Sequence, residues 1–251
     1  CWESPYDWLC GLALEIPQDA PAYQPPKRVL LEDFELFIAR EFADEERGLY
    51  LAVKGGHNDT SHNHNDVGSV TLYRDGRPLL IDVGVETYSK KTFSPQRYEI
   101  WTMQSGWHNL PQFDPDGAKY DQQPGAAFAA ADVTVTDALD GLAMDLAPAY
   151  GSVPGLGRYR RSVHLTDTGL TLRDETDYPG TVALTLMSVE KPAVDGDTVA
   201  FGTLAAAAVT GADKIVTEAV PITDPRLRQA WPDTLYRTRI YFTQQLSLVI
   251  G

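Results

Sequence analysis

Cysteine is almost missing from this chain of 251 residues, and the two that occur, Cys1 and Cys10, both lie at its beginning. Two cysteines in one short segment support neither a disulfide scaffold nor a metal site built on thiolates, and a bridge between them is left open. A metal site in this chain must therefore use histidine and carboxylate ligands.

Positive charge is also scarce. The chain has 21 Lys and Arg against 35 Asp and Glu, which gives a formal net charge of -14. A field of that sign opposes nucleic acid, an anionic membrane surface and the long-range steering of a polyanion. We therefore predict no nucleic-acid partner and no membrane partner. If the substrate is an acidic glycan, local arginine and lysine side chains must overcome the overall field.

Long apolar runs are absent, and no stretch approaches the length needed to span a bilayer. The chain begins with Cys1 instead of Met, and it lacks the basic start and hydrophobic centre of a secretory signal. We expect a processed or truncated portion of a longer protein. Its location stays open between periplasmic or secreted and cytoplasmic.

Residues 1–28 differ from the rest of the chain. Ser4 and Pro5 suit the start of a short helix that runs to about Leu14, and four prolines then break any regular element before residue 28. We predict the end of a preceding helical domain followed by a Pro-rich linker. A tail packed on the following domain fits these residues equally well.

From residue 29 to residue 251, short strand patterns alternate with turn signals. Val70–Tyr73 and Pro78–Val83 flank Asp75-Gly76, a pair that favours a two-residue hairpin turn. Similar pairs surround Asp140-Gly141 and Thr168-Gly169, and a final strand is predicted over Thr238–Ile250. No segment with helical periodicity competes. This pattern predicts one all-β domain, a large antiparallel β-sandwich. The loop from Gly106 to Gln123 is predicted to be long and functional.

The densest group of ligand-type side chains is the run Ser-His-Asn-His-Asn-Asp-Val-Gly-Ser that begins at residue 61. If this run is extended, the period of two places His62, His64 and Asp66 on one face. Two imidazoles can then converge on one ion, or one can hold an ion while the other acts on a substrate. We interpret Asn65 and Asp66 as turn residues that orient the imidazoles.

Further ligand-type residues follow. Asp82 ends an apolar run that predicts a buried strand, where an isolated carboxylate would need a cation, hydrogen bonds or a metal. His108 lies in a Trp-His-Asn-Leu-Pro run. Two imidazoles and one carboxylate with an open fourth position form a recognised zinc arrangement.

Other polar residues are interpreted more simply. His57 is expected to shape a loop, and His164 is expected to be an ordinary strand residue. Arg158, Arg160 and Arg161 form a basic run in which strand alternation exposes two of the three on one face, and we interpret that face as solvated.

Three segments together resemble the C-terminal β-domain of the heparinase II/III-like polysaccharide lyases. They are the Gly-Gly-His-Asn-Asp through His-Asn-His-Asn-Asp-Val-Gly-Ser region, Leu80–Gly84 with Tyr88, and Trp107–Pro111. The resemblance is dense from about Leu49 to Pro111. It implies one structural Zn²⁺ per chain, which organises the loops under a cleft and is held by His64, Asp82 and His108.

The resemblance also implies β-elimination of a uronic-acid-containing polysaccharide. His62 and Tyr88 are the implied catalytic residues, with Tyr98 as an alternative tyrosine. In this family a large N-terminal α-toroid domain of the same protein completes the cleft. The isolated chain is therefore expected to be inactive.

Three more side chains are predicted to contact an acidic sugar. Arg97 suits bidentate contact with an acidic group, Trp107 suits stacking, and Gln104 suits hydrogen bonding.

Two other classes of function compete with a lyase. A cupin-like metalloenzyme also uses a His-x-His pair, an acid and a later histidine, but Asp82 lies too far after His64 for the short cupin spacing. A noncatalytic carbohydrate-binding or structural module, with zinc for stability alone, is the second. Glycan binding without cleavage would favour that module.

Overall fold

The computed structural model describes residues 25–43 and 47–251. In these residues the regular structure consists of β-strands and short 3-10 turns, with no α-helix. The predicted all-β class is therefore confirmed. No described helix is long and apolar enough to cross a membrane. The helix predicted near the start of the chain, and nearly all of the predicted linker, lie outside the described residues.

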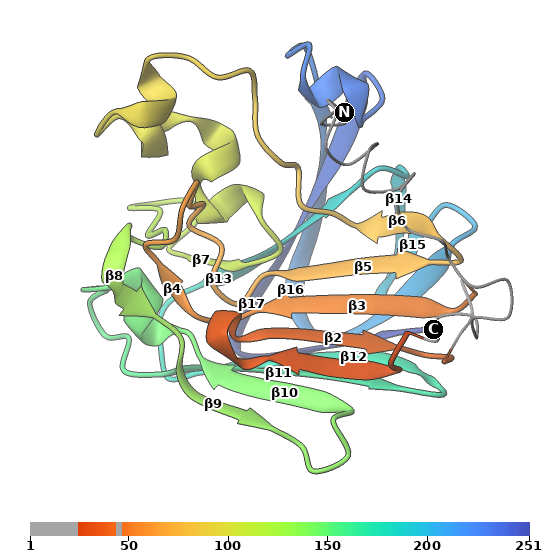
Figure 1. The fold of residues 1–251 in the computed structure, drawn as a ribbon. Helices are drawn as coiled ribbons and strands as arrows, with labels where there is room; N and C mark the ends of the chain where they lie inside the picture. Colours follow the sequence, from red (N-terminus) through yellow and green to blue (C-terminus); the bar gives the residue numbers. More distant parts are fainter. Residues whose placement is uncertain (1–24, 44–46) are drawn as a thin grey trace, which may run out of the picture.

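The first sheet has five antiparallel strands in the order β1-β2-β3-β5-β6 and lies at the front of Figure 1. The predicted hairpin at Asp75-Gly76 is confirmed. Both turn residues have positive φ, 51° and 72°, as the tight hairpin turn requires. The strands span β1 (Arg28–Leu31), β2 (Leu36–Arg40), β3 (Leu49–Lys54), β5 (Val70–Arg74) and β6 (Arg77–Leu80).

The second sheet has ten strands, eight of them in the order β14-β15-β16-β17-β12-β11-β10-β9. The remaining two, β13 and β7, pair with each other, and β13 also pairs with β17. The hairpins predicted at Asp140-Gly141 and Thr168-Gly169 are confirmed. The strands span β7 (Pro111–Phe113), β9 (Ala131–Val135), β10 (Gly141–Asp145), β11 (Tyr159–Thr166), β12 (Gly169–Thr176), β13 (Val182–Ser188), β14 (Pro192–Asp195), β15 (Thr198–Phe201), β16 (Ala205–Pro221) and β17 (Thr234–Ile250).

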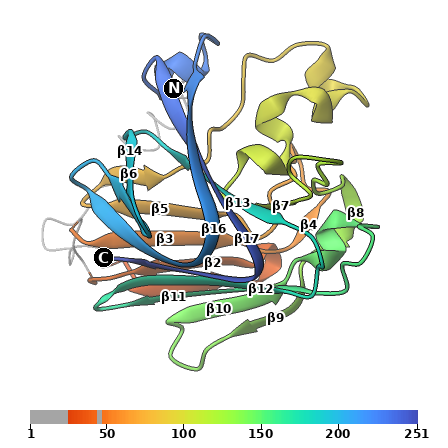
Figure 2. The same cartoon turned by 180° about the vertical axis from the view of Figure 1, so that it is seen from behind.

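β17 organises the second sheet because it bends at Gln244, whose φ is 65°. Before the bend its edge pairs with β13, and after the bend the same edge pairs with β12. Its other edge pairs with β16 along nearly its whole length, as Figure 2 shows. Gly211 of β16 lies opposite the bend, where an added Cβ would come within 2.5 Å of the Gln245 carbonyl oxygen. Glycine is therefore required there.

The predicted loop over 106–123 is partly wrong, because β7 occupies its middle and joins the second sheet through β13. β4 (His57–Asn58) and β8 (Gly125–Ala129) form a separate two-stranded sheet beside it. The β7–β13 and β4–β8 pairings hold the long connecting segments at one end of the sandwich. Backbone hydrogen bonds therefore fix the segments that carry the candidate residues.

Two apolar cores support this end of the molecule. The larger core fills the space between the two big sheets. A smaller one supports the segment after β6 and consists of Ile81, Val83, Met187, Val220, Ile222, Leu227 and Leu235. Above it stands a series of 3-10 turns, seen as the short coils at the upper left of Figure 1. The turns are η2 (Lys91–Phe93), η3 (Arg97–Glu99), η4 (Trp101–Met103) and η5 (Ser105–Trp107).

Candidate functional site

The histidine-rich run that begins at Ser61 is a series of turns and not a strand. The expectation that His62, His64 and Asp66 share one strand face is therefore wrong. The physical reason is a local turn: the Asn63 backbone N–H donates to the Thr60 carbonyl, and the Asn63 side-chain oxygen accepts from the Thr60 hydroxyl at 3.2 Å. His62 takes a left-handed conformation, φ 58°, at the tip of this turn. Its ring is exposed while Asn63 is buried.

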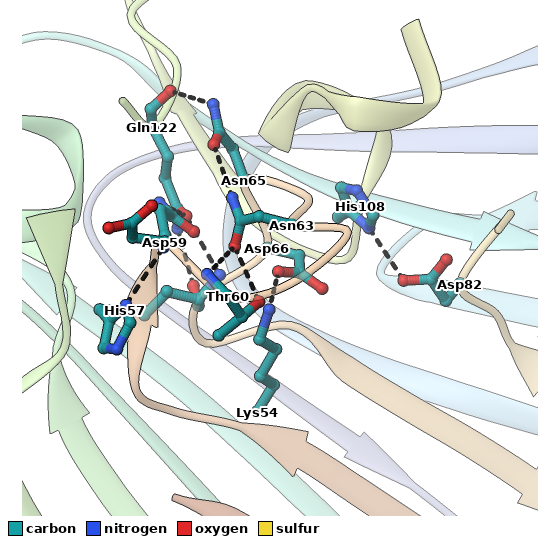
Figure 3. A network of polar contacts seen from close by, with 12 residues as sticks. Lys54, His57, Asp59, Thr60, Asn63, Asn65, Asp66, Asp82, His108 and Gln122 are labelled. Atoms are coloured by element: carbon teal, nitrogen blue, oxygen red, sulfur yellow. Dashed lines mark hydrogen bonds and ion pairs between the residues drawn. The ribbon is translucent and has the colours of Figure 1, made fainter. Parts of the chain in front are cut away.

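Buried amides hold this turn in place (Figure 3). The Asn63 amide donates to the Tyr98 hydroxyl at 3.1 Å, and the Asn65 amide donates to the Gln122 carbonyl at 3.0 Å. The Gln122 side chain in turn accepts from the Val67 N–H and donates to the Val67 carbonyl. The loop that carries His64 is therefore a rigid element. Sequence reasoning missed Gln122, because no local pattern marks it.

Asp66 contributes to the same support. It forms an ion pair with Lys54, at the end of β3, and its negative charge also acts on the two nearby imidazoles, because it opposes the lowering of the His64 pKa and adds to the raising of the His108 pKa. Figure 3 shows this pair beside the amide network, separate from His108 and Asp82.

The side chains of His64, Asp82 and His108 meet although they come from three separate segments. Their nearest ligand atoms all lie within 4.8 Å of one another. A metal ion could therefore be reached by all three after small side-chain rotations. The arrangement of two imidazoles and one carboxylate matches that of zinc sites with an open fourth position.

His108 carries the clearest sign that the cluster fits a metal. Its Nε2 lies 3.1 Å from the Thr102 carbonyl oxygen, which can only accept, so Nε2 is the donor. Its Nδ1 is buried and lies 3.2 Å from Asp82 Oδ2, yet it makes no hydrogen bond of good geometry. A histidine that donates through one ring nitrogen to a carbonyl and leaves the other facing a carboxylate is oriented as metal-bound histidines are.

The electrostatics of the cluster favour ligation at two of the three residues. Burial, with the nearby positive charge of His108, lowers the pKa of His64 and keeps its imidazole neutral. Burial alone would raise the pKa of Asp82, but His108 outweighs it and holds that pKa well below its usual range. Burial alone would lower the pKa of His108, but the carboxylate of Asp82 raises it. Of the three candidate ligands, His108 is therefore the one that would have to lose a proton for a metal to bind.

His62 and Tyr88 form an exposed pair, and His62 lies two residues before His64 of the cluster. Their rings are stacked, with centroids 6.1 Å apart and an interplanar angle of 11°, and the Tyr88 hydroxyl lies 3.5 Å from His62 Nδ1. Phe93 stands edge-on to Tyr88 and is 69% exposed. The two candidate catalytic groups thus lie together at the surface, where a large ligand can reach both.

A polar hollow of about 400 Å³ adjoins His62, whereas Tyr88 is not among its lining residues. Its size lies within the range of about 300–1,000 Å³ usual for small-ligand sites. Both His62 and the alternative Tyr98 border it. Its lining residues are Asp59, Thr60, Ser61, His62, Asn63, Thr92, Phe93, Ser94, Arg97 and Tyr98.

The sequence model of the family described as "Heparinase II/III-like, C-terminal" matches residues 25–248. This chain belongs to that family. The match covers nearly every residue that the structure describes, so the resemblance seen in the short motifs extends over the whole β-domain. The family match and the two open sheets described above differ from the small closed barrel of a cupin, so the cupin-like alternative is excluded. No curated protein sequence matches the chain significantly.

Solved structures agree with the heparinase II/III-like fold. A heparan sulfate lyase, HepC from Pedobacter heparinus, has a TM-score of 0.63 at 15% identity, over 92% of this chain and 36% of that chain. A heparinase III has a TM-score of 0.58 at 18% identity, over 86% of this chain and 35% of that chain. The present chain thus spans about a third of their length.

The same sandwich also occurs in a 4-alpha-glucanotransferase from Thermococcus litoralis. It has a TM-score of 0.52 at 12% identity, over 90% of this chain and 39% of that chain. Identities this low establish the fold alone. Because enzymes of different names share the fold, the reaction has to be argued from the site.

In this heparinase II/III-like domain the three predicted sugar contacts lie in different places. Arg97 lines the hollow, but its Nε and Nη1 donate to the Asn63 and Thr92 carbonyls, each at 2.8 Å. Gln104 donates to the Tyr98 carbonyl, and Trp107 packs edge-on against Trp101. Neither Gln104 nor Trp107 lines the hollow, and the role of all three in binding stays a prediction.

Asn109, next to His108, is a supporting residue that sequence reasoning missed. Its buried amide donates to the carbonyls of Val70 and Ile81, and its side-chain oxygen accepts from the Met187 N–H at 2.7 Å. It therefore ties β5 and the segment after β6 to β13. In the sequence, the only feature that pointed to a role for Asn109 was its position directly after the candidate ligand His108.

Arg161 is fully buried, whereas Arg158 is exposed and Arg160 is partly exposed, so strand alternation exposes two of the three arginines, as predicted. Arg161 forms a two-pronged ion pair with Asp174, at 2.8 and 2.7 Å, and its Nη1 donates to the carbonyls of Gly68 and Asn109. Those carbonyls end the loops that carry His64 and His108. The buried alternation of β11 contained the signal, because Arg161 shares its face with the apolar residues Val163 and Leu165.

Proposed function

We propose that this chain is the metal-binding β-domain of a polysaccharide lyase that cleaves uronic-acid-containing glycans by β-elimination. An N-terminal α-toroid domain of the same protein would complete the cleft. The observation that carries this proposal is the exposed His62–Tyr88 pair, in which His62 borders a polar hollow and lies two residues before His64 of the cluster.

In β-elimination, a base removes the proton from the carbon that bears the carboxylate. The electrons of that C–H bond form a double bond to the neighbouring carbon, and the C–O bond to the leaving sugar breaks as its oxygen takes a proton. A neutral imidazole at His62 can accept the first proton, and the Tyr88 hydroxyl can donate the second. Their 3.5 Å separation also allows a proton to pass between them and reset the pair.

Zn²⁺ at His64, Asp82 and His108 would supply structural cross-linking, since it would join the histidine turn, the segment after β6 and the end of the 3-10 turns. The chain's own residues then perform the chemistry. The rigid turn from Thr60 to Asn63 presents His62, and the segment that begins at Asp82 leads to Tyr88. The segments that the ion would join therefore include those that hold His62 and Tyr88 in position.

The proposed function is tested by incubating the full-length protein with heparan sulfate, hyaluronan, chondroitin and alginate. The ultraviolet absorbance of unsaturated uronates reports cleavage. We expect product from at least one of these acidic glycans, and none when the isolated chain is used. A glycan that binds the full-length protein without being cleaved would instead support a carbohydrate-binding module. Turnover by the isolated chain would show that the toroid domain is not needed.

Metal removal is expected to destabilise the chain. We expect about one zinc per chain by elemental analysis and a lower melting temperature after chelation, because an ion that binds only the folded state stabilises it. His64→Ala should remove the zinc, whereas the matched variant His164→Ala, on β11, should retain it. A metal-free preparation with unchanged melting temperature would contradict the assignment of the three ligands.

Zinc binding should also depend on pH in a defined direction. Because the pKa of His108 is raised and that of His64 is lowered, protons compete with zinc chiefly at His108. We expect full affinity above the raised pKa of His108 and a fall in affinity as the pH decreases through it. Zinc titrations at several pH values, with proton release followed in weak buffer, measure this. Affinity that rises toward acidic pH would contradict the direction.

A further inference from the structure

The loop between the two longest strands, residues 222–233, reaches the candidate site. Its Asp224 side chain accepts from the Thr87 N–H, at 3.1 Å to each oxygen. The same carboxylate accepts from the N–H groups of Arg226 and Leu227, at 2.9 and 3.1 Å. Asp224 thus shapes its own loop and attaches it to the residue before Tyr88.

Two more contacts fix this loop to the segment after β6. The Trp231 indole N–H donates to the Val83 carbonyl at 2.8 Å. Leu227 is buried in the smaller core together with Ile81 and Val83. The loop is therefore attached on both sides of Asp82, although it lies more than a hundred residues further along the chain.

This attachment places Arg226 against the ring of Tyr88. Its guanidinium carbon lies 4.5 Å from the centroid of the Tyr88 ring. The side chain is exposed, and no carboxylate of the described residues forms an ion pair with it. Arg228 of the same loop differs, because it is paired with Asp233 and donates to the Trp231 carbonyl.

Two other cations of this region are already engaged. Arg97 donates to two backbone carbonyls, and Lys91 pairs with Glu99 at 2.7 Å. The planar fork of an arginine matches the oxygens of a carboxylate or a sulfate. On a chain with a formal net charge of -14, a cation held beside the reacting groups provides the local attraction that an acidic glycan needs.

We propose that Arg226 is a specificity-determining residue that binds an anionic group, carboxylate or sulfate, of the glycan held at His62 and Tyr88. This inference rests on the proposed lyase function. It adds the residues 222–233 to the substrate surface and predicts that the surface selects acidic over neutral sugars. Arg226 orients the ligand, while His62 and Tyr88 move the protons.

The test compares Arg226→Gln with the wild type in the full-length protein, on heparan sulfate and on its unsulfated counterpart. We expect KM to rise about ten- to hundredfold, as for loss of a hydrogen bond to a charged group, with little change in kcat. A rise on the sulfated polymer alone identifies sulfate as the group bound, and a rise on both identifies the carboxylate. Unchanged KM on both polymers would overturn the proposal.

Two variants separate this role from a structural one. Arg226→Lys keeps the charge without the fork and should recover part of the lost affinity. Arg173→Gln removes the same charge from β12, where Arg173 pairs with Glu175, and should leave KM unchanged. Both should unfold at the wild-type temperature. If Arg173→Gln raised KM equally, the change in net charge alone would explain the effect. That result would also overturn the proposal.

A binding measurement keeps this inference distinct from the lyase assignment. Calorimetry with a heparin oligosaccharide, on the full-length protein carrying His62→Ala, compares affinity with and without Arg226→Gln. If no glycan is cleaved by the wild type but Arg226→Gln still weakens binding, the lyase assignment fails and the Arg226 assignment holds. If the oligosaccharide binds equally to both, or to neither, the Arg226 assignment fails.

Discussion

Alanine at His62 is expected to lower kcat/KM for glycan cleavage by the full-length protein about 10²- to 10⁴-fold, the usual contribution of general acid–base catalysis. Its zinc content should not change, because the His62 ring is exposed and faces Tyr88, whereas the candidate metal ligands are His64, Asp82 and His108. Turnover is followed by unsaturated uronate, and zinc by elemental analysis of the same preparation.

Matched variants decide how this result is interpreted. His57→Ala changes a histidine whose Nδ1 only accepts from the Asp59 N–H, and activity should be retained. Tyr88→Phe keeps the stacked ring but removes the hydroxyl, and its loss should approach that of His62→Ala. If Tyr98→Phe is the inactive variant instead, the alternative tyrosine is the catalytic one. Loss of zinc in His62→Ala would make His62 a ligand.

Replacing Arg161 by methionine is expected to destabilise the chain by about 3–5 kcal/mol, since the charge of Asp174 would be left buried without its partner. The carbonyls of Gly68 and Asn109 would lose their donor as well. Because those groups end the loops that carry two of the candidate ligands, zinc affinity should fall together with stability. Denaturant unfolding and a zinc titration measure the two effects.

Two comparisons test the physical cause. Arg160→Met, at the neighbouring and partly exposed position on β11, should change stability by no more than about 0.5 kcal/mol. The double variant Arg161→Met/Asp174→Leu should regain much of the loss, because an apolar pair can replace a buried ion pair. Equal effects at positions 160 and 161 would show that the buried pair has no special role.

Local patterns were sufficient to predict the strands with clear turn signals. Asp75-Gly76 and Thr168-Gly169 do form hairpins, because the turn residues themselves favour the required backbone. β16 was not predicted, since it opens with four alanines, which are weak strand formers. Its pairing with β17 along both halves of the strand overrides that preference.

At the candidate site, the sequence correctly predicted which residues come together, but it did not predict the local backbone structure that brings them together. His64, Asp82 and His108 do meet, but the run around His62 is a turn held by Thr60 and Asn63 and not a strand. The contacts of Arg226 depend on a loop far along the chain. No spacing rule reveals such a contact, because it is created by the length and bend of two strands and not by neighbouring residues.

The bend in β17 also bears on the order in which the protein acquires its shape. β12, β13 and β16 all use β17 as a neighbour, so each of them has an unpaired edge until residues 234–250 are in place. The contacts of β17 with β12 and β13 join distant parts of the chain, which makes them slow to form. The loop that carries Arg226 is closed by the same event. We therefore infer that a nascent chain cannot display the complete proposed glycan-binding surface before the sheet itself is finished.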